Sequence, residues 1–180
     1  MSSGEILKWR PFAHPDGTER DLSFLDAHDV TYTHSAAGKQ DIEYRFLVTY
    51  SFHCFTKDYE HQAAEEQAAL MYVTRKEKRP FCEHRYQRAS MYLRDVICSL
   101  GQRKVIHAGY GSFATVELEL ENGETAFYYV VFKSFREAKK FRLHVTSAYP
   151  VDAKPGGAKV SFFVIAHKLK TNRPLPHPPK

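Results

Sequence analysis

Three hydroxyl-bearing side chains stand close together near the end of one stretch of the sequence, FRLHVTSAYPVD. Thr146, Ser147 and Tyr149 fall within four positions, and Arg142 and His144 precede them. Hydroxyls grouped with cations in this way can hold a phosphate or another polar substrate. The alternative is a strand end at which a tyrosine packs its ring and leaves its hydroxyl in water. The spacing is compatible with both interpretations.

The same stretch has the pattern of a β-strand. Leu143 and Val145 alternate with Arg142, His144 and Thr146, which is the period of two that a pleated strand requires. The proline at position 150 has no N–H to donate, so we expect it to end the ladder.

Further polar side chains are candidates for the same site. His53 and Thr56 stand at the exit of an earlier strand, Arg85 opens a helix, and Lys133 ends a strand. In an antiparallel meander, Lys133 and Arg142 would flank one connection while the hydroxyl cluster would lie at the opposite strand end, roughly 15–25 Å away. We therefore expect His53 and Arg85, rather than that pair, to complete the hydroxyl cluster.

The periodicity of the apolar residues predicts an α+β domain. Alternation over residues 44–55 predicts a half-buried strand, and apolar steps of three and four over 85–100 predict a helix that Gly101 ends. Between them, HQAAEEQAALMYV is either a helix or a polar loop with a short helix. Four more strands are predicted, with an Asn-Gly turn after the first and a longer connection, SFREAKK, after the second: 112–120, 125–133, 141–149 and 160–167.

These elements predict helices packed on a four- to five-stranded antiparallel meander sheet. Residues 1–38 are interpreted as an N-terminal arm or loop, 39–170 as a single domain and 171–180 as a Pro-rich extended tail.

Composition narrows the classes of protein. At 180 residues, with 43% hydrophobic and 26% charged residues, the chain can build a core and is not a disordered tail. The net charge of +5 is a mild basic bias that suits a nucleic-acid partner. Three cysteines without framework spacing, no leader-like start and no long apolar run indicate a soluble cytoplasmic protein with no membrane partner.

No metal or cofactor is expected. His53, Cys54, Cys82 and His84 have the residue types of a zinc site but not its spacing. The glycines of HAGYGSF precede a strand instead of opening a helix, so they do not form a phosphate loop.

Four segments between residues 44 and 152 carry a family resemblance: HCFT, RPFCEHRYQRASMYLRDVICSL, YYVVFKSF and FRLHVTSAYPVD. Together they resemble a group of bacterial proteins carried on mobile elements, a resemblance that implies no particular activity. More distantly, a basic strand ending in Thr/Ser-Ala-Tyr after a helix-then-meander order is similar to the barnase–EndoU–colicin–RelE-like ribonuclease superfamily. That resemblance implies a RelE/barnase-like fold, a metal-independent RNA-cleaving toxin, and RNA and a neutralising antitoxin protein as partners.

The resemblance also implies roles for the candidate residues. Thr146, Ser147 and Tyr149 match the superfamily's late-strand catalytic positions, while His53 and Arg85 match by residue type. A base would remove the ribose 2′-hydroxyl proton, a cation would stabilise the phosphate oxygens and an acid would release the 5′-oxygen. The remaining candidates are expected to contact RNA: Thr56, Lys133, Arg142 and His144. The alternative function is a non-enzymatic accessory protein of a mobile element that binds nucleic acid or protein through its sheet.

Overall fold

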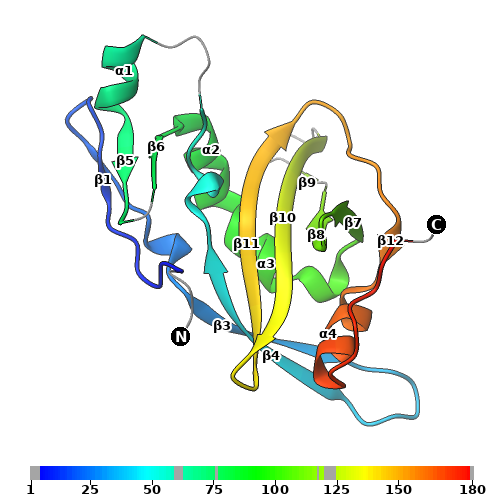
Figure 1. The fold of residues 1–180 in the computed structure, drawn as a ribbon. Coiled ribbons are helices and arrows are strands. Elements are labelled where there is room, and N and C mark those ends of the chain that lie inside the picture. Colours follow the sequence, from blue (N-terminus) through cyan, green and yellow to red (C-terminus); the bar gives the residue numbers. More distant parts are fainter. Residues whose placement is uncertain (1–4, 59–62, 76, 117, 120–124, 179–180) are drawn as a thin grey trace.

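A mixed, curled β-sheet organises the fold in the computed structural model (Figure 1). The structure describes residues 5–58, 63–75, 77–116, 118–119 and 125–178. From one edge to the other, the main sheet contains β12 (Lys159–Val160), β7 (Val105–Gly109), β8 (Ser112–Thr115), β10 (Thr125–Glu137), β11 (Lys140–Val151), β4 (Ile42–Tyr50) and β3 (His28–His34). Off this path, β9 (Leu118–Glu119) also pairs with β10.

The predicted antiparallel meander of four to five strands, and with it the RelE/barnase-like fold, is wrong. The centre of the sheet contains a parallel pair, β11 with β4, in which Leu143 lies opposite Val48. Parallel neighbours need a long crossover, because the chain must return to the same end of the sheet. Here the crossover contains about half of the protein, and the alternation of apolar residues carries no information about such a distant partner.

The prediction of a strand at 160–167 is also wrong. Only β12 is extended there, and α4 (Phe162–Lys170) follows it directly. The fully buried residues Phe162, Ile165 and Ala166 recur at helical spacing, and Leu169 continues the same stripe. A short run that is apolar on both faces does not distinguish a covered strand from a buried helix.

The connection between β10 and β11 is a tight hairpin instead of the predicted longer loop. The strands extend to Glu137 and Lys140, so that only Ala138 and Lys139 form the turn, with φ of 45° and 66°. Positive φ at both central residues suits the right-handed twist of a hairpin. The predicted Asn-Gly turn lies outside the described residues.

The helix predicted for 85–100 is confirmed as one continuous helical run. It contains α2 (Glu83–Arg88), a π-helical turn η3 (Ala89–Leu93) and α3 (Arg94–Cys98), and the 3₁₀ turn η4 (Leu100–Gln102) follows. With α4, this helix covers one face of the sheet and encloses the core. Among the residues with no exposed surface there are Phe46, Val48, Leu93, Ile97, Leu100, Phe132, Leu143 and Val145.

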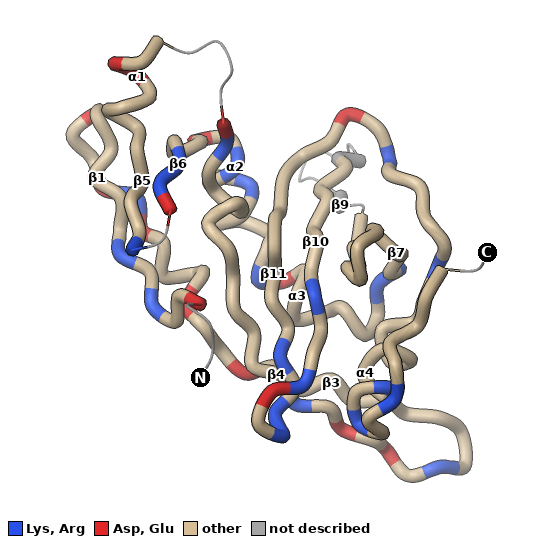
Figure 2. Tube along the Cα trace, in the orientation of Figure 1, with Lys and Arg blue, Asp and Glu red and all other residues tan. Residues whose placement is uncertain are grey.

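A smaller lobe stands beside the sheet (Figure 1). It contains β1 (Phe12–Ala13), β2 (Glu19–Arg20), the 3₁₀ turn η1 (Ser23–Leu25), α1 (Ala64–Ala69), β5 (Met71–Val73) and β6 (Lys78–Pro80). Aromatic rings hold it to the exit of β4: the Phe55 ring centroid is 5.3 Å from that of Trp9 and 5.0 Å from that of Tyr72. Charged residues of both signs are spread over the lobe and the sheet (Figure 2).

Candidate functional site

A β-bulge sets which side chains share the face of the sheet opposite the helices, called here the groove face. The register between β10 and β11 shifts after Val131, so that Ser147 pairs with Val131 and Val145 pairs with Phe132. Thr146 is the extra residue, and the alternation changes phase at it. As a result Ser147 and Tyr149 share the groove face with His144.

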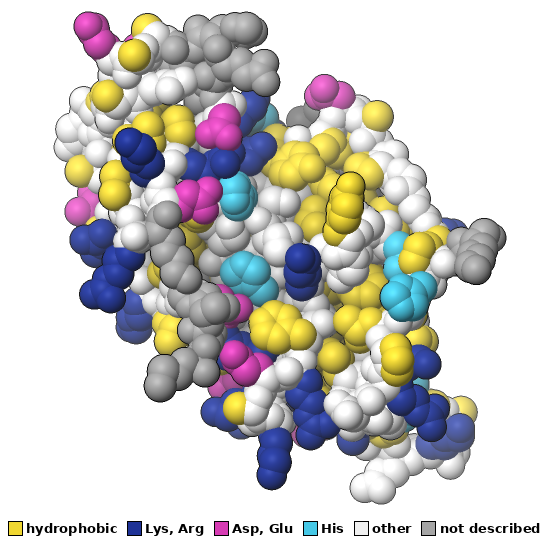
Figure 3. All heavy atoms as spheres, in the orientation of Figure 1, with side chains coloured by type: hydrophobic (Ala, Val, Ile, Leu, Met, Phe, Trp, Pro, Cys, Tyr) yellow, Lys and Arg dark blue, Asp and Glu magenta, His cyan; other side chains and the backbone are white. Residues whose placement is uncertain are grey.

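A groove of about 510 Å³ lies between the small lobe and this face of the sheet. The 3₁₀ turn η2 (Phe52–Cys54), which follows β4, forms part of its wall. Histidine and lysine side chains lie in the middle of the face, with hydrophobic side chains to either side (Figure 3). The residues that line the groove include Glu5, Trp9, Ser51, Phe52, Glu77 and His144.

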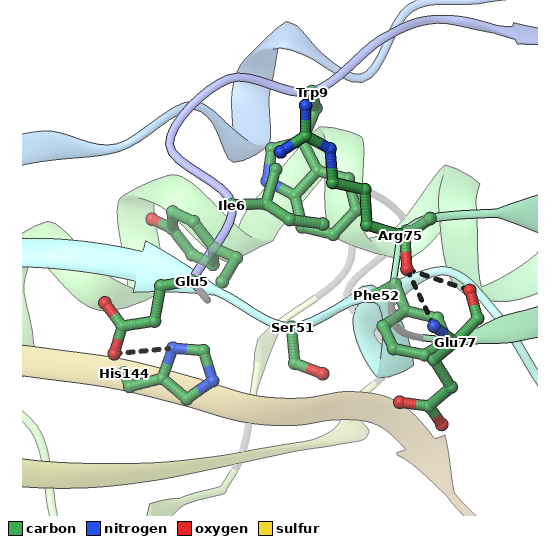
Figure 4. Close-up of a pocket in the computed structure, with 10 residues that line it drawn as sticks. Glu5, Ile6, Trp9, Ser51, Phe52, Arg75, Glu77 and His144 are labelled. Carbon is green, nitrogen blue, oxygen red and sulfur yellow. Dashed lines mark hydrogen bonds and ion pairs between the residues drawn. The ribbon is translucent and has the colours of Figure 1, made fainter. Parts of the chain in front are cut away.

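His144 lines the groove, and its Nδ1 is directed at Glu5 (Figure 4). The Oγ1 of Thr49, a residue only 1% exposed, lies 2.9 Å from His144 Nδ1 and donates to Glu5 Oε2 at 3.0 Å. A hydroxyl has one proton, so Thr49 must accept from His144, and Nδ1 carries the imidazole hydrogen. Nε2 is then the unprotonated nitrogen, and the ring directs it away from Glu5 (Figure 4).

The surroundings of His144 favour its neutral form. Burial lowers its pKa, and the positive charges of Arg142 and Lys133 lower it further, while Glu5 acts in the opposite direction. Desolvation and neighbouring cations both penalise the imidazolium ion. His144 therefore has the protonation state and the tautomer that a general base needs.

Arg142 fixes Glu5 from below the groove. Its guanidinium is ion-paired with Glu5 and, at 3.1 Å, with Glu137, and its side chain is 9% exposed. Glu5, Thr49, Arg142 and His144 are called here the His144 network. Lys133 is exposed and lies directly across the strand pair from His144.

Arg85 and Tyr149 form a second group further along β11. Arg85 Nη1 donates to the carbonyls of His53 at 3.2 Å and Thr56 at 2.7 Å, so the arginine braces the η2 turn. Its guanidinium carbon lies 4.9 Å from the centroid of the Tyr149 ring. Tyr149 also meets Tyr129 edge to face at 5.7 Å. The structure thus brings Arg85 and Tyr149 together.

The other predicted residues have different surroundings. His53 is about one-third exposed, and its Nε2 lies 4.0 Å from Glu77; burial and, after it, the charge of Arg79 lower its pKa. Thr56 has no exposed surface and donates to the Phe52 carbonyl. Thr146 donates to the Val131 carbonyl across the bulge. Because the two threonine hydroxyls are used by backbone carbonyls, Ser147 and Tyr149 carry the remaining hydroxyls on the groove face.

Sequence reasoning missed Glu5 and Thr49. Thr49 stands inside a strong strand pattern, where a polar residue on the solvent-side face is unremarkable. Glu5 is 137 positions from Arg142 in the chain, and nothing in the sequence links them. Pairing places Lys133 beside His144, and Val131, two residues before Lys133, beside Ser147.

Among the described residues, no three His, Cys, Asp or Glu side chains are grouped so that they could hold a metal ion. In the same part of the chain, no helix has the length and apolar character needed to cross a membrane.

Comparisons with known proteins agree on one family. The sequence model of the YjaZ family matches residues 11–170. The chain is 58% identical to Protein YjaZ of Escherichia coli (strain K12) over 176 residues, which cover 98% of each chain. No solved structure matches.

Proposed function

Taking as our premise that the chain belongs to the YjaZ family, we propose that the groove binds single-stranded RNA and cleaves it without a metal ion. The observation that carries the proposal is the His144 network. Thr49 and Glu5 hold the imidazole in the tautomer with a free Nε2, and burial keeps it neutral. The comparisons bear on family membership alone, and the mobile-element setting stays a prediction.

The proposed reaction needs a general base, a cation beside the phosphate and a general acid. His144 Nε2 takes the proton of a ribose 2′-hydroxyl, and that oxygen attacks the adjacent phosphorus. The ammonium of Lys133 stabilises the phosphate oxygens and gives a proton to the departing 5′-oxygen. The products are a 2′,3′-cyclic phosphate and a free 5′-hydroxyl, and no water or cofactor is consumed.

The spacing along β11 supports this division. Ser147 follows His144 on the same face, roughly 7 Å away because the bulge makes it the next outward residue. Tyr149 is about 7 Å further, roughly 14 Å from His144, so the Tyr129–Tyr149 ring pair would meet a neighbouring base along the RNA instead of the same phosphorus. We therefore assign Tyr149 to base stacking, worth about 1–3 kcal/mol per base, and Arg85 to holding its ring.

The test is an RNA-cleavage assay in EDTA with a labelled single-stranded RNA and its DNA counterpart. We expect RNA alone to be cut, to a cyclic phosphate, and His144→Gln to lose about a hundredfold or more in rate. His167→Gln is the matched control, since His167 is exposed on α4. No cleavage by the wild type, or full activity of folded His144→Gln, would refute the proposal.

A second function, binding without cleavage, has its own supporting observation. The Tyr129–Tyr149 pair and the exposed Lys133 provide stacking and charge without any need for a base. A gel shift that depends on Tyr149 and Lys133 but not on His144, with intact RNA, favours this function. Toxicity and an antitoxin partner stay predictions, which growth after repressed and induced expression would test.

A further inference from the structure

A second pocket lies outside the groove, between α4 and the hairpin that β3 and β4 form. Its volume is about 380 Å³. Figure 1 shows α4 beside that hairpin at the edge of the main sheet. Its walls are mainly apolar and include Ile42, Tyr44, Phe163 and Val164.

Packing holds the apolar floor in place. The Phe163 ring centroid lies 4.6 Å from that of His34 and 6.2 Å from that of Tyr44. Behind Phe163 stands Gly101, where an added Cβ would come within 2.8 Å of Phe163 Cζ. The glycine therefore leaves room for the ring. Val164 lines the pocket and is 44% exposed, so its side chain is accessible to a ligand there.

The rim of this pocket is cationic. Lys39 comes from the hairpin, Lys168 from α4, and His34 and His167 add two further nitrogen donors. None of the described residues that line the pocket is acidic. Cations near the end of α4 complement its dipole, and Figure 2 shows them there. The helix dipole does not explain Lys39, which lies in the β3–β4 hairpin and lines the same pocket.

We propose that this pocket binds a small anionic amphiphile, namely a carboxylate attached to an apolar body. The carboxylate would lie between Lys39 and Lys168, and the apolar body would cover Phe163, Tyr44 and Val164. A pocket that combines an apolar floor with a few convergent polar groups is the usual form of a small-molecule site. The proposal does not depend on RNA cleavage, because the pocket shares no lining residue with the groove.

The first test compares octanoate, below its micelle concentration, with 1-octanol by calorimetry and NMR on the full chain. We expect saturable one-to-one binding of octanoate, weaker binding of octanol, and shifts of the His34 and His167 ring protons. His144→Gln should bind octanoate as the wild type does. Absence of saturable binding, or equal affinity for acid and alcohol, would overturn the proposal.

Two pairs of variants test the charge and the location. Lys39→Gln with Lys168→Gln should weaken octanoate binding about tenfold, because each exposed ion pair is worth roughly a factor of two to five, and should leave octanol unchanged. Val164→Glu should weaken octanoate binding relative to Val164→Gln, which has nearly the same shape and no charge. Val164 is exposed, so both variants should fold, and circular dichroism checks this. Equal octanoate affinities within the valine pair would place the ligand elsewhere and refute the assignment.

Discussion

The ion pair between Arg142 and Glu5 leads to a prediction about stability, tested by the substitution Arg142→Met. The side chains of Arg142 and Glu5 are 9% and 14% exposed, so removing the guanidinium leaves a buried carboxylate without its counter-charge. Breaking a buried pair from one side costs roughly 3 kcal/mol. With a urea m-value of about 2 kcal/mol/M, the unfolding midpoint should fall by about 1.5 M.

A double-mutant cycle separates this charge effect from lost packing. Adding Glu5→Gln removes the unpaired charge, so the double variant should recover at least about 1 kcal/mol relative to the sum of the single changes. Arg45→Met is the matched control: its pair with Asp29 is 2.8 Å long but 73% and 51% exposed, and should cost less than about 0.5 kcal/mol. If Arg142→Met costs no more than Arg45→Met, or the cycle is additive, the network does not hold Glu5 as argued.

Three further predictions follow from other features. Burial lowers the pKa of His28 and of His144 from the ordinary 6.5, so the unfolded chain takes up protons first and the free energy of unfolding should fall as pH drops below about 6.5. Urea unfolding at a series of pH values should give a smaller dependence of this free energy on pH for His144→Gln than for the wild type. An unchanged dependence would contradict the prediction. Lys139→Gly should raise the free energy of unfolding by about 1 kcal/mol, since glycine adopts the φ of 66° without strain. Thermal unfolding measures this change, and an unfolding temperature no higher than that of the wild type would contradict it. Arg85→Met should weaken RNA binding by freeing the Tyr149 ring, whereas Tyr149→Phe, which keeps the ring, should bind nearly normally in a gel shift; the reverse order would show that the hydroxyl matters instead.

Sequence patterns predicted the elements that carry their own periodicity. The strand β4 and the helix at 83–98 were predictable because each buries one face. Apolar residues therefore recur every two positions in the strand and every 3.6 in the helix. The stretch that became α4 is apolar all round, so its period was ambiguous. The parallel pairing of β4 with β11 depends on contacts between residues about a hundred positions apart, which local patterns do not encode.

The candidate site was predictable in part for the same reason. Residue types indicated His144, Lys133, Arg85 and Tyr149 as groups that could do chemistry, and all four lie at or beside the groove face. Glu5 gave no signal, since its role exists only where the N-terminal segment crosses the sheet beside Arg142.

The bulge at Thr146 lets one strand supply apolar side chains to the core and polar side chains to the groove face. If alternation continued unbroken from Leu143 and Val145, Ser147 and Tyr149 would point into the core and Ala148 would point out. The bulge reverses this: Ala148 has no exposed surface, and Tyr149 lies against Arg85 and Tyr129 instead. The core thereby keeps a small apolar residue, and the groove gains a hydroxyl and an aromatic ring in line with His144. A bulge leaves no signal in the composition or charge of a strand. The sequence therefore contains the groove's side chains but does not indicate the face on which they meet.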